Sequence, residues 1–281
     1  MKNLSASSTS KVLRTLFNYS LTLSLLLCLS IPAHAEDELT DDGGFLEFNF
    51  GYSVFNSRFV DAPDNDSLFL NLHLNFRWNG FFIENKGDKG LGKAGAGYNF
   101  YNNQDWSFDA YITEIHDEID PNSDYIIGNV HAGLIGIEFR DSDQRLGLRA
   151  TRYLNSSTAL RFFIAPIGSH GVYAGAWLGR TWQHKNFNFY AISSLQYHAT
   201  KTLDYYYGVH PQESSDKFPQ YQASGGITLT GEMGVTYPLS KDWIIESSFK
   251  VTRLPSSIYH SPLIDNKVEP VAKLSLTYVL F

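Results

Sequence analysis

The chain has almost no cysteine and no apolar run long enough to cross a membrane as a helix. Of its 281 residues, one is a cysteine (Cys28) and 43% are hydrophobic. This scarcity argues against a disulfide framework, a cysteine-based metal site and a thiol nucleophile. The composition is too apolar for a disordered chain and too polar for a bundle of membrane-spanning helices. The 20 Phe, 17 Tyr and 5 Trp residues nevertheless need somewhere to be buried.

Residues 1–35 have the three parts of a secretory signal peptide. A start with three basic residues and no acidic one precedes an apolar run at 21–31, and Ala33-His34-Ala35 offers an A-x-A cleavage site. The run is about half of the ~20 residues that a spanning helix needs. We therefore expect a cleaved signal peptide at 1–35, which removes Cys28, and a mature protein at 36–281.

Loss of this leader makes the mature chain more acidic. It takes three of the 22 Lys and Arg residues and leaves 19 against 29 Asp and Glu residues, a net charge of −10. Basic stripes or clusters that could neutralise phosphates do not occur in the remaining sequence. Nucleic acid is therefore not an expected partner.

Much of the mature chain alternates apolar and polar residues with a period of two, which is typical of strands with two different faces. In the clearest segment, Leu68, Leu70 and Leu72 alternate with Asn71 and His73. Such segments are longer than ordinary soluble strands and approach the ~9–11 residues of a tilted strand that crosses a bilayer. We predict about twelve strands, near 44–55, 66–78, 80–86, 91–101, 105–115, 127–140, 144–153, 169–183, 186–200, 223–238, 242–254 and 269–281.

The connections between these segments alternate in length, apart from the brief 87–90. Asn79-Gly80 is a strong hairpin-turn signal, and the other short turns carry Asn, Asp or Ser. Membrane barrels have short periplasmic turns at one rim and longer loops at the other. The sequence therefore predicts an all-β fold, a single transmembrane antiparallel β-barrel in the Gram-negative outer membrane. We expect short turns at 79–80, 102–104, 141–143, 184–186 and 240–242, and longer connections at 56–65, 116–126, 154–168, 201–222 and 255–268.

Several segments resemble one family of outer-membrane proteins. The stretches DYYYGVHPQE at 204–213 and FPQYQASGG at 218–226 resemble the YYGV…E…YxxxGG region of the MipA/OmpV family. Residues 234–243 resemble its closing hairpin, and 71–97 is more loosely similar to its second and third hairpins. The resemblance implies an outer-membrane barrel in contact with lipid and lipopolysaccharide. It also implies possible murein partners, because the best-known members are described as scaffolds joining a lytic murein transglycosylase to a bifunctional murein synthase; others are described as adhesion or permeability proteins.

The last strand of the predicted barrel ends in Phe281. Outer-membrane barrels resemble one another in closing on a strand that ends in Phe, and this chain is similar to them in that respect. Tyr278 and Leu280 share one face of an ideal strand, which puts Phe281 on the other. A bulge near Val279 would restore the usual phase.

Polar residues on the outer connections are the candidates for a catalytic site. A hydrolase needs a nucleophile, a base within reach and an orienting acid, but the adjacent Ser169 and His170 would point to opposite faces of a strand. Neither G-x-S-x-G nor H-E-x-x-H occurs. We expect no enzymatic activity; an active site would require Ser169, a histidine and an acid to converge. The candidate residues are Ser169, His170, His198, Asp204, His210, Glu213 and His260.

Metal ligands are also not predicted by the spacing of the histidines. The acidic patches at 61–66 and 116–120 could loosely hold a hard cation through oxygen ligands. Neither patch has a glycine turn at the required offset, so solvated loops that face lipopolysaccharide are the better interpretation. We expect no resident metal or cofactor.

The polar face of the strands should line the lumen and must pair internally or meet water, because unpaired charges in a dry core cost several kcal/mol each. A barrel of about twelve strands is wider than a filled eight-stranded one and narrower than a porin. Two functions follow: a plugged barrel acting as a scaffold or as a receptor or adhesin, of which we favour the scaffold, or a narrow pore for small solutes. The expected lumen residues are His73, Asn75, Arg77, Arg149, Thr151, Thr228, Thr230, Glu232, Glu246, Ser248, Lys250 and Lys273.

Aromatic residues near strand ends are expected to form girdles at the membrane interfaces. The cluster Tyr205–Tyr207 differs, because it opens the longest outer connection. We expect it to pack that connection onto the rim; folding inward as a constriction or binding an external ligand are the alternatives. The expected girdle residues are Tyr173, Trp177, Trp182, Phe187, Phe189, Tyr190, Tyr237 and Trp243.

Overall fold

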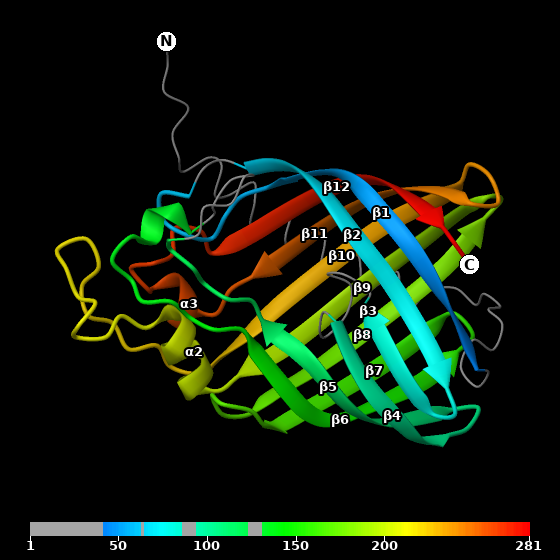
Figure 1. The fold of residues 1–281 in the computed structure, drawn as a ribbon, viewed down its shortest axis with the longest axis horizontal. Helices are drawn as coiled ribbons and strands as arrows, with labels where there is room; N and C mark the ends of the chain where they lie inside the picture. Colours follow the sequence, from blue (N-terminus) through cyan, green and yellow to red (C-terminus); the bar gives the residue numbers. More distant parts are fainter. Residues whose placement is uncertain (1–41, 63–64, 86–93, 123–130) are drawn as a thin grey trace, which may run out of the picture.

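The computed structural model describes residues 42–62, 65–85, 94–122 and 131–281, so the expected signal peptide at 1–35 lies outside the described residues. Twelve antiparallel strands form a closed barrel in which each pairs with its neighbour in sequence and the last pairs with the first (Figure 1). The predicted fold class and strand number are confirmed. Helices in the described ranges are all too short or too polar to cross a membrane.

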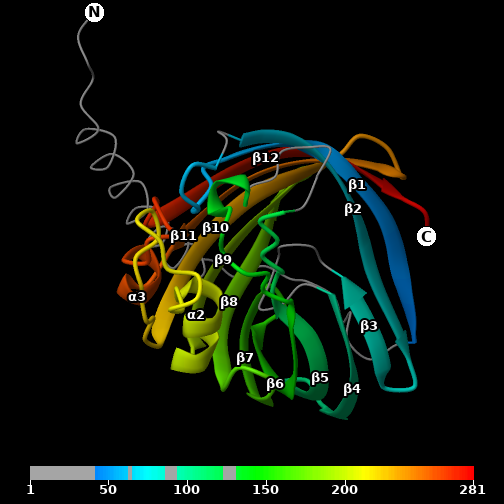
Figure 2. The ribbon, with the colours of Figure 1, turned by 60° about the vertical axis from the view of Figure 1, so that its left-hand side comes forward.

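The strands are long and tilted, as Figures 1 and 2 show. Their bounds are β1 Gly43–Phe55, β2 Asn65–Trp78, β3 Phe81–Asn85, β4 Ala94–Asn102, β5 Trp106–His116, β6 Asp143–Asn155, β7 Thr158–Ile167, β8 Tyr173–His184, β9 Phe187–His198, β10 Gly226–Pro238, β11 Trp243–Arg253 and β12 Val268–Val279. Short helices follow three of them: η1 Ala132–Leu134, α2 Thr200–Tyr207 and α3 Ser256–Tyr259.

Apolar side chains cover the outside of the barrel. Leu68 and Leu70 are each 72% exposed, and Phe50, Ile83 and Leu148 lie on the same outer surface. A continuous apolar band of this kind is unfavourable in water, but it is the lipid-facing surface of a membrane barrel. The alternation in the sequence is therefore an alternation between lipid and lumen.

The two rims differ in the length of their connections, as predicted. At one rim the connections between the described strands are all short turns, which the alternation assigns to the periplasmic side. At the Asn79-Gly80 turn both residues have positive φ, 49° and 82°, the backbone that a type I′ hairpin requires and that Asn and Gly tolerate. The long connections with η1, α2 and α3 gather at the opposite rim, on the left in Figure 1.

Two predictions about the middle of the chain are wrong. One predicted strand is absent from the described residues and one observed strand was not predicted, so the total of twelve is unchanged. The predicted strand 127–140 lies partly outside the described residues, and its remainder forms η1 and irregular chain. Its apolar residues Leu134 and Ile137 pack in a loop cluster at the long rim, not in the barrel wall. The predicted turn at 141–143 consequently ends a long connection instead of forming a short one.

The second error is the predicted connection 154–168, which contains strand β7. The segment resembles a loop because it begins with polar residues and contains Pro166. Apart from Arg161, the inner face of β7 is apolar, with Phe163 3% exposed and Ala165 completely buried, so the strand has little contrast between its two faces. The short turn at this point is at 156–157.

The end of the chain has the expected irregularity. The carbonyl of Leu46 accepts a hydrogen bond from Leu280 N at 2.9 Å, while Leu46 N donates to the carbonyl of Phe281 at 3.1 Å. Two residues of the closing segment therefore oppose one residue of β1, which is the arrangement of a β-bulge. As a result both Leu280 and Phe281 are exposed on the barrel surface.

Candidate functional site

The lumen has two unlike walls, and the first is filled by its own side chains. We call the inner face of β3–β8 the filled wall. Phe82, Tyr111, Phe163 and Tyr173 form a buried aromatic cluster there, with Trp177 packed against it. The expected girdle is therefore wrong for Tyr173 and Trp177, because an aromatic residue near a strand end can face inward when neighbouring strands supply rings to meet it.

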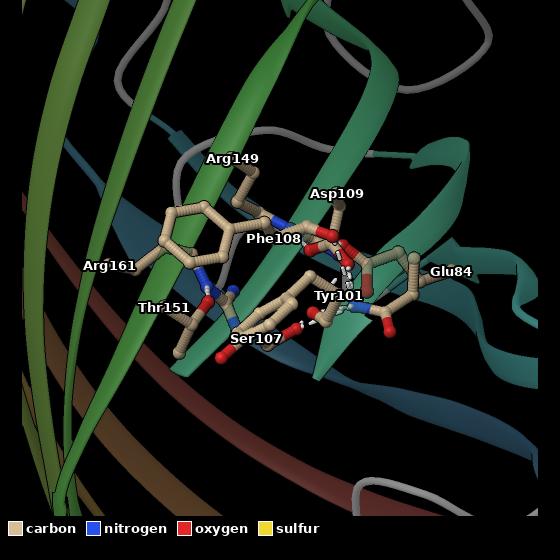
Figure 3. A network of polar contacts seen from close by, with 9 residues as sticks. Glu84, Tyr101, Ser107, Phe108, Asp109, Arg149, Thr151 and Arg161 are labelled. Atoms are coloured by element: carbon tan, nitrogen blue, oxygen red, sulfur yellow. Dashed lines mark hydrogen bonds and ion pairs between the residues drawn. The ribbon is translucent and has the colours of Figure 1, made fainter. Parts of the chain in front are cut away.

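A buried ion network crosses the filled wall (Figure 3). The guanidinium of Arg149 donates to Glu84 at 2.5 Å and to Asp109 at 2.7 Å, and it lies 4.2 Å from the ring centroid of Tyr111. The pairing of β5 with β6 places Asp109 directly opposite Arg149. The predicted inward positions of Arg149 and Thr151 are confirmed. The sequence analysis did not identify either carboxylate partner, Glu84 or Asp109. Both could have been placed inward by extending the alternation of apolar and polar residues from the neighbouring lumen positions.

The second wall, the inner face of β9–β12, carries short polar and charged side chains, and we call it the lined wall. Glu232 stands opposite Lys250 in the pairing of β10 with β11. The hydroxyl of Tyr190 lies 2.6 Å from Glu246 and 3.0 Å from Glu232. Tyr190 therefore faces the lumen and not a membrane interface. The expected girdle residues that lie near the short-turn rim in aromatic ring contacts are Trp182, Phe187, Phe189, Tyr237 and Trp243.

A cavity of about 830 Å³ lies beneath the long connections, between the lined wall and the ends of β5 and β8 at that rim. Thr228, Thr230 and Gln196 line it from the strands, and Tyr206 and Tyr207 line it from α2. It leads to a pocket of only about 40 Å³, which shares Glu232 and Lys250 with the cavity. The small pocket is also lined by the predicted lumen residues His73, Glu246, Ser248 and Lys273.

The long connections form an apolar roof over this cavity, which we call the loop cap. Its buried members come from the three connections that contain η1, α2 and α3, and Phe59 and Val60 of the β1–β2 connection pack against them. Figure 2 shows α2 and α3 at this rim. Tyr206 and Tyr207 are buried in it, so the expectation that this cluster packs its connection onto the rim is confirmed. The buried members are Ile119, Leu134, Ile137, Leu203, Tyr206, Tyr207, Val209, Phe218, Ala223, Leu254, Ile258, Leu263 and Ile264.

Buried polar contacts hold the loop cap together. Arg140 donates to Glu213 at 2.5 Å, and the backbone N–H groups of Glu138 and His210 donate to the same carboxylate. Burial alone would raise the pKa of Glu213, but these hydrogen bonds outweigh it and lower the pKa below its usual value. Arg58 makes a second tie, donating to Glu269 and to the hydroxyl of Tyr207, each at 2.7 Å.

Arg145 connects the filled wall to the loop cap. Its side chain is completely buried, pairs with Asp143 at 2.6 Å and donates to Thr202 of α2 at 3.0 Å. It also donates to the carbonyl of Gly171 in the β7–β8 turn. These contacts fix α2 relative to the barrel wall.

The candidate catalytic residues do not converge on one point. Ser169 lies in the β7–β8 turn, and in the described part of the chain no hydrogen bond joins it to a histidine or carboxylate. The ring of His170 stacks on Tyr205 at 3.9 Å, and burial lowers its pKa. Asp204 accepts from the backbone of Ala223 at 2.9 Å.

The remaining candidates also lie apart. His198 Nδ1 is 3.1 Å from His116 Nε2 at the cavity wall, His210 and Glu213 belong to the loop cap, and His260 follows α3. Among the described residues, no group of three or more His, Cys, Asp and Glu side chains could hold a metal ion. Of the acidic patch at 61–66, the described Asp61 pairs with Lys217 at 2.9 Å.

Comparison with known proteins places this architecture in a family. The family described as MltA-interacting protein MipA matches residues 51–280. The chain belongs to this family. It is 26% identical over 87 residues to outer membrane protein OmpV of Vibrio cholerae, and 23% identical over 87 residues to Omp26La of Vibrio anguillarum. Each match covers 31% of this chain and 34% of the relative, so the chain spans about a third of the curated relatives it matches.

Among solved structures, this MipA-family barrel is similar to the NanC porin, with 9% identity and a TM-score of 0.46 over 82% of this chain and 98% of the other. The curated relatives are named outer membrane proteins, and the barrel carries a lipid-facing apolar band. The protein is therefore located in the Gram-negative outer membrane.

The family-like motif residues form the loop cap. In this MipA-family chain Tyr206, Tyr207 and Val209 lie in its buried core, and Glu213 accepts from Arg140. Val209 and Tyr221 pair through two backbone hydrogen bonds of 2.8 and 3.1 Å. The segment that carries the resemblance thus builds the roof of the cavity.

Proposed function

We propose that this protein is a non-enzymatic outer-membrane barrel that admits small polar solutes through its capped lumen. The observation that carries the proposal is the cavity of about 830 Å³ along the lined wall, which leads toward a pocket of about 40 Å³. Cavities of several hundred Å³ are of the size that holds small molecules. The filled wall restricts the route to the other side of the lumen.

The chemistry of the narrow region favours small polar solutes. Glu232 and Glu246 lie there with Lys250 and Lys273, so a solute would pass groups of both signs within one small pocket. Apolar or bulky molecules would lose hydration without finding room or apolar contacts. We expect slow passage and weak binding, not the bulk conduction of a wide porin.

Planar-bilayer recording tests this function. We expect a small conductance for the wild-type barrel and a larger, more cation-selective one for Lys250→Ala, because the substitution widens the narrow region and removes a positive charge. Lys241→Ala is the matched control, since Lys241 is exposed in a short turn outside the lumen. The pore proposal fails if both the wild type and Lys250→Ala give no current above baseline.

A second candidate function follows from the family. The family's description, MltA-interacting protein, supports a scaffold that holds a murein transglycosylase and a murein synthase at the membrane. The short-turn rim would be the docking face, because that rim is on the periplasmic side. At one of its turns Arg152 pairs with Asp105 at 2.8 Å and lies over the ring of Trp106, which orders the turn.

Crosslinking followed by co-purification tests the scaffold. We expect capture of a murein transglycosylase by the wild-type barrel and weaker capture after charge reversal at Arg152 and Lys241. Charge reversal at Lys217 in the loop cap, at the opposite rim, should have no effect. Failure to capture either murein enzyme with an intact barrel would remove this candidate without affecting the pore proposal.

A further inference from the structure

The outer surface of the barrel has an apolar groove where β2 to β5 meet. The groove has a volume of about 510 Å³ and follows two rungs of paired residues. In the first rung, the large side chains of Trp78, Phe81 and Tyr98 end at Ala110 on β5. The small residue leaves a gap in an otherwise bulky apolar band.

The second rung has its small residue one strand earlier. Here Phe76 and Ile83 are followed by Ala96 on β4, and then by Ile112 on β5. Ala96 and Ala110 are diagonal neighbours, so the two gaps join into one hollow. Large side chains flank it on both sides.

The two faces of β4 are filled differently at this point. Gly95 and Gly97 face the lumen, where aromatic rings from neighbouring strands lie close against them. A Cβ on Gly97 would be 2.5 Å from Phe82 Cζ, and one on Gly95 would be 2.7 Å from Tyr111 Cε2. The inner hollow is thus filled by the chain itself, and these rings support the groove floor from behind.

Nothing in the described residues fills the outer hollow, which is continuous with the lipid-facing surface. An unfilled apolar groove would lose dispersion contacts along its lining, so in a membrane a hydrocarbon chain must occupy it. Because rings pack behind the floor and the hollow is already formed, a chain seated there makes more contacts than one on the convex wall. It should exchange more slowly than ordinary surrounding lipid.

We propose that this groove is a binding site for one acyl chain of a phospholipid in the periplasmic leaflet. The leaflet follows from the position of the groove, because Trp78 and Phe81 flank the Asn79-Gly80 turn at the short-turn rim. Trp78 is 63% exposed, and its indole N–H and the hydroxyl of Tyr98 can donate to a phospholipid headgroup at that depth. The lipopolysaccharide of the outer leaflet lies at the opposite rim.

Native mass spectrometry tests the site on the full protein extracted from outer membranes in a mild detergent, where phospholipid and lipopolysaccharide are both present. We expect one phospholipid retained per wild-type barrel and at least a tenfold lower occupancy in Ala110→Phe, whose ring fills the hollow. Ala272→Phe on the outer face of β12 is the matched control and should retain the lipid. The heat-dependent gel shift of folded barrels confirms folding of each variant, and Ala96→Leu replaces Ala110→Phe if the latter does not fold.

Three outcomes would overturn the proposal. They are a wild-type barrel without retained lipid, equal retention by the folded groove variant and the control, and a bound mass that matches lipid A instead of a phospholipid. None of these depends on solute passage through the lumen, so the result is independent of the proposed function.

Discussion

The filled wall and the lined wall are built from the same alternating strands, yet they leave opposite interiors. On the filled wall, aromatic rings surround Arg149 and its two carboxylates, so these three charged groups are buried and paired with one another. On the lined wall, threonine, glutamine and charged side chains border an open cavity. The comparison shows that one barrel can divide its lumen between a structural half, where substitutions should cost stability, and a functional half, where they should alter solute passage.

The largest expected effect is loss of the Arg149 network. Arg149→Ala leaves Glu84 and Asp109 as buried carboxylates without their partner, and breaking a buried pair costs about 3–5 kcal/mol. Urea unfolding of the barrel in vesicles measures this loss. A destabilisation below about 1 kcal/mol would mean that water reaches these carboxylates and that the filled wall is not dry.

Acidification should loosen the loop cap in two stages while the filled wall stays closed. Burial lowers the pKa of His170, so its contribution is complete above the unfolded value of about 6.5 and is lost as pH falls through the lower folded value. The pKa of Glu213 is also lowered, so its contribution is complete above about 4.3 and is lost as pH falls through its folded value.

Hydrogen exchange of segment 200–223, corrected for intrinsic rates and compared with strands β5 and β6, measures this opening. His170→Phe should remove the upper stage, because the ring can still stack on Tyr205. Glu213→Gln should remove the lower stage and weaken the cap at neutral pH by about 1–3 kcal/mol, since Arg140 loses a charged acceptor. If hydrogen exchange of the loop cap and of β5 and β6 increased together on acidification, the loop cap and the filled wall would not differ in their response to pH.

Matched threonine substitutions compare the walls directly. Thr151→Ala on the filled wall removes a hydroxyl that accepts from Arg161 at 3.3 Å, which should cost about 1–3 kcal/mol because Arg161 is left without that partner. Thr230→Ala on the lined wall removes a hydroxyl 3.3 Å from that of Thr252, and water in the cavity should replace it at a cost below about 1 kcal/mol. Equal losses of unfolding free energy for the two variants in urea would contradict the difference between the filled wall and the lined wall.

The smallest expected effect lies outside both walls. Arg152 pairs with Asp105 at the short-turn rim, where both side chains are partly exposed. Arg152→Ala should cost about 0–1 kcal/mol, because exposed ion pairs contribute little. A loss as large as that of Arg149→Ala in the same unfolding experiment would mean that ion pairing at the rim, and not burial in the filled wall, sets the stability.

The accuracy of each strand prediction depended on how strongly the two faces of the strand differ in polarity. β2 and β10 were predicted closely because polar lumen residues alternate with apolar lipid-facing ones. β7 was missed because Phe163 and Ala165 face an apolar interior, which removes the alternation. The filled wall was thus the part of the barrel that the sequence predicted least well. For the candidate cavity, the sequence predicted only a set of inward polar residues.

The sequence by itself determined the barrel, the difference in connection length between its two rims and the inward position of residues such as Glu232 and Lys250. These properties follow from local period, turn chemistry and connection length, which need no knowledge of distant contacts. Only the tertiary structure decided that Arg149 meets Glu84, that Tyr190 faces Glu246, and that Leu134 joins a cap instead of a strand. Those outcomes depend on which strands stand opposite or diagonal and how far their side chains reach, and barrel closure sets both.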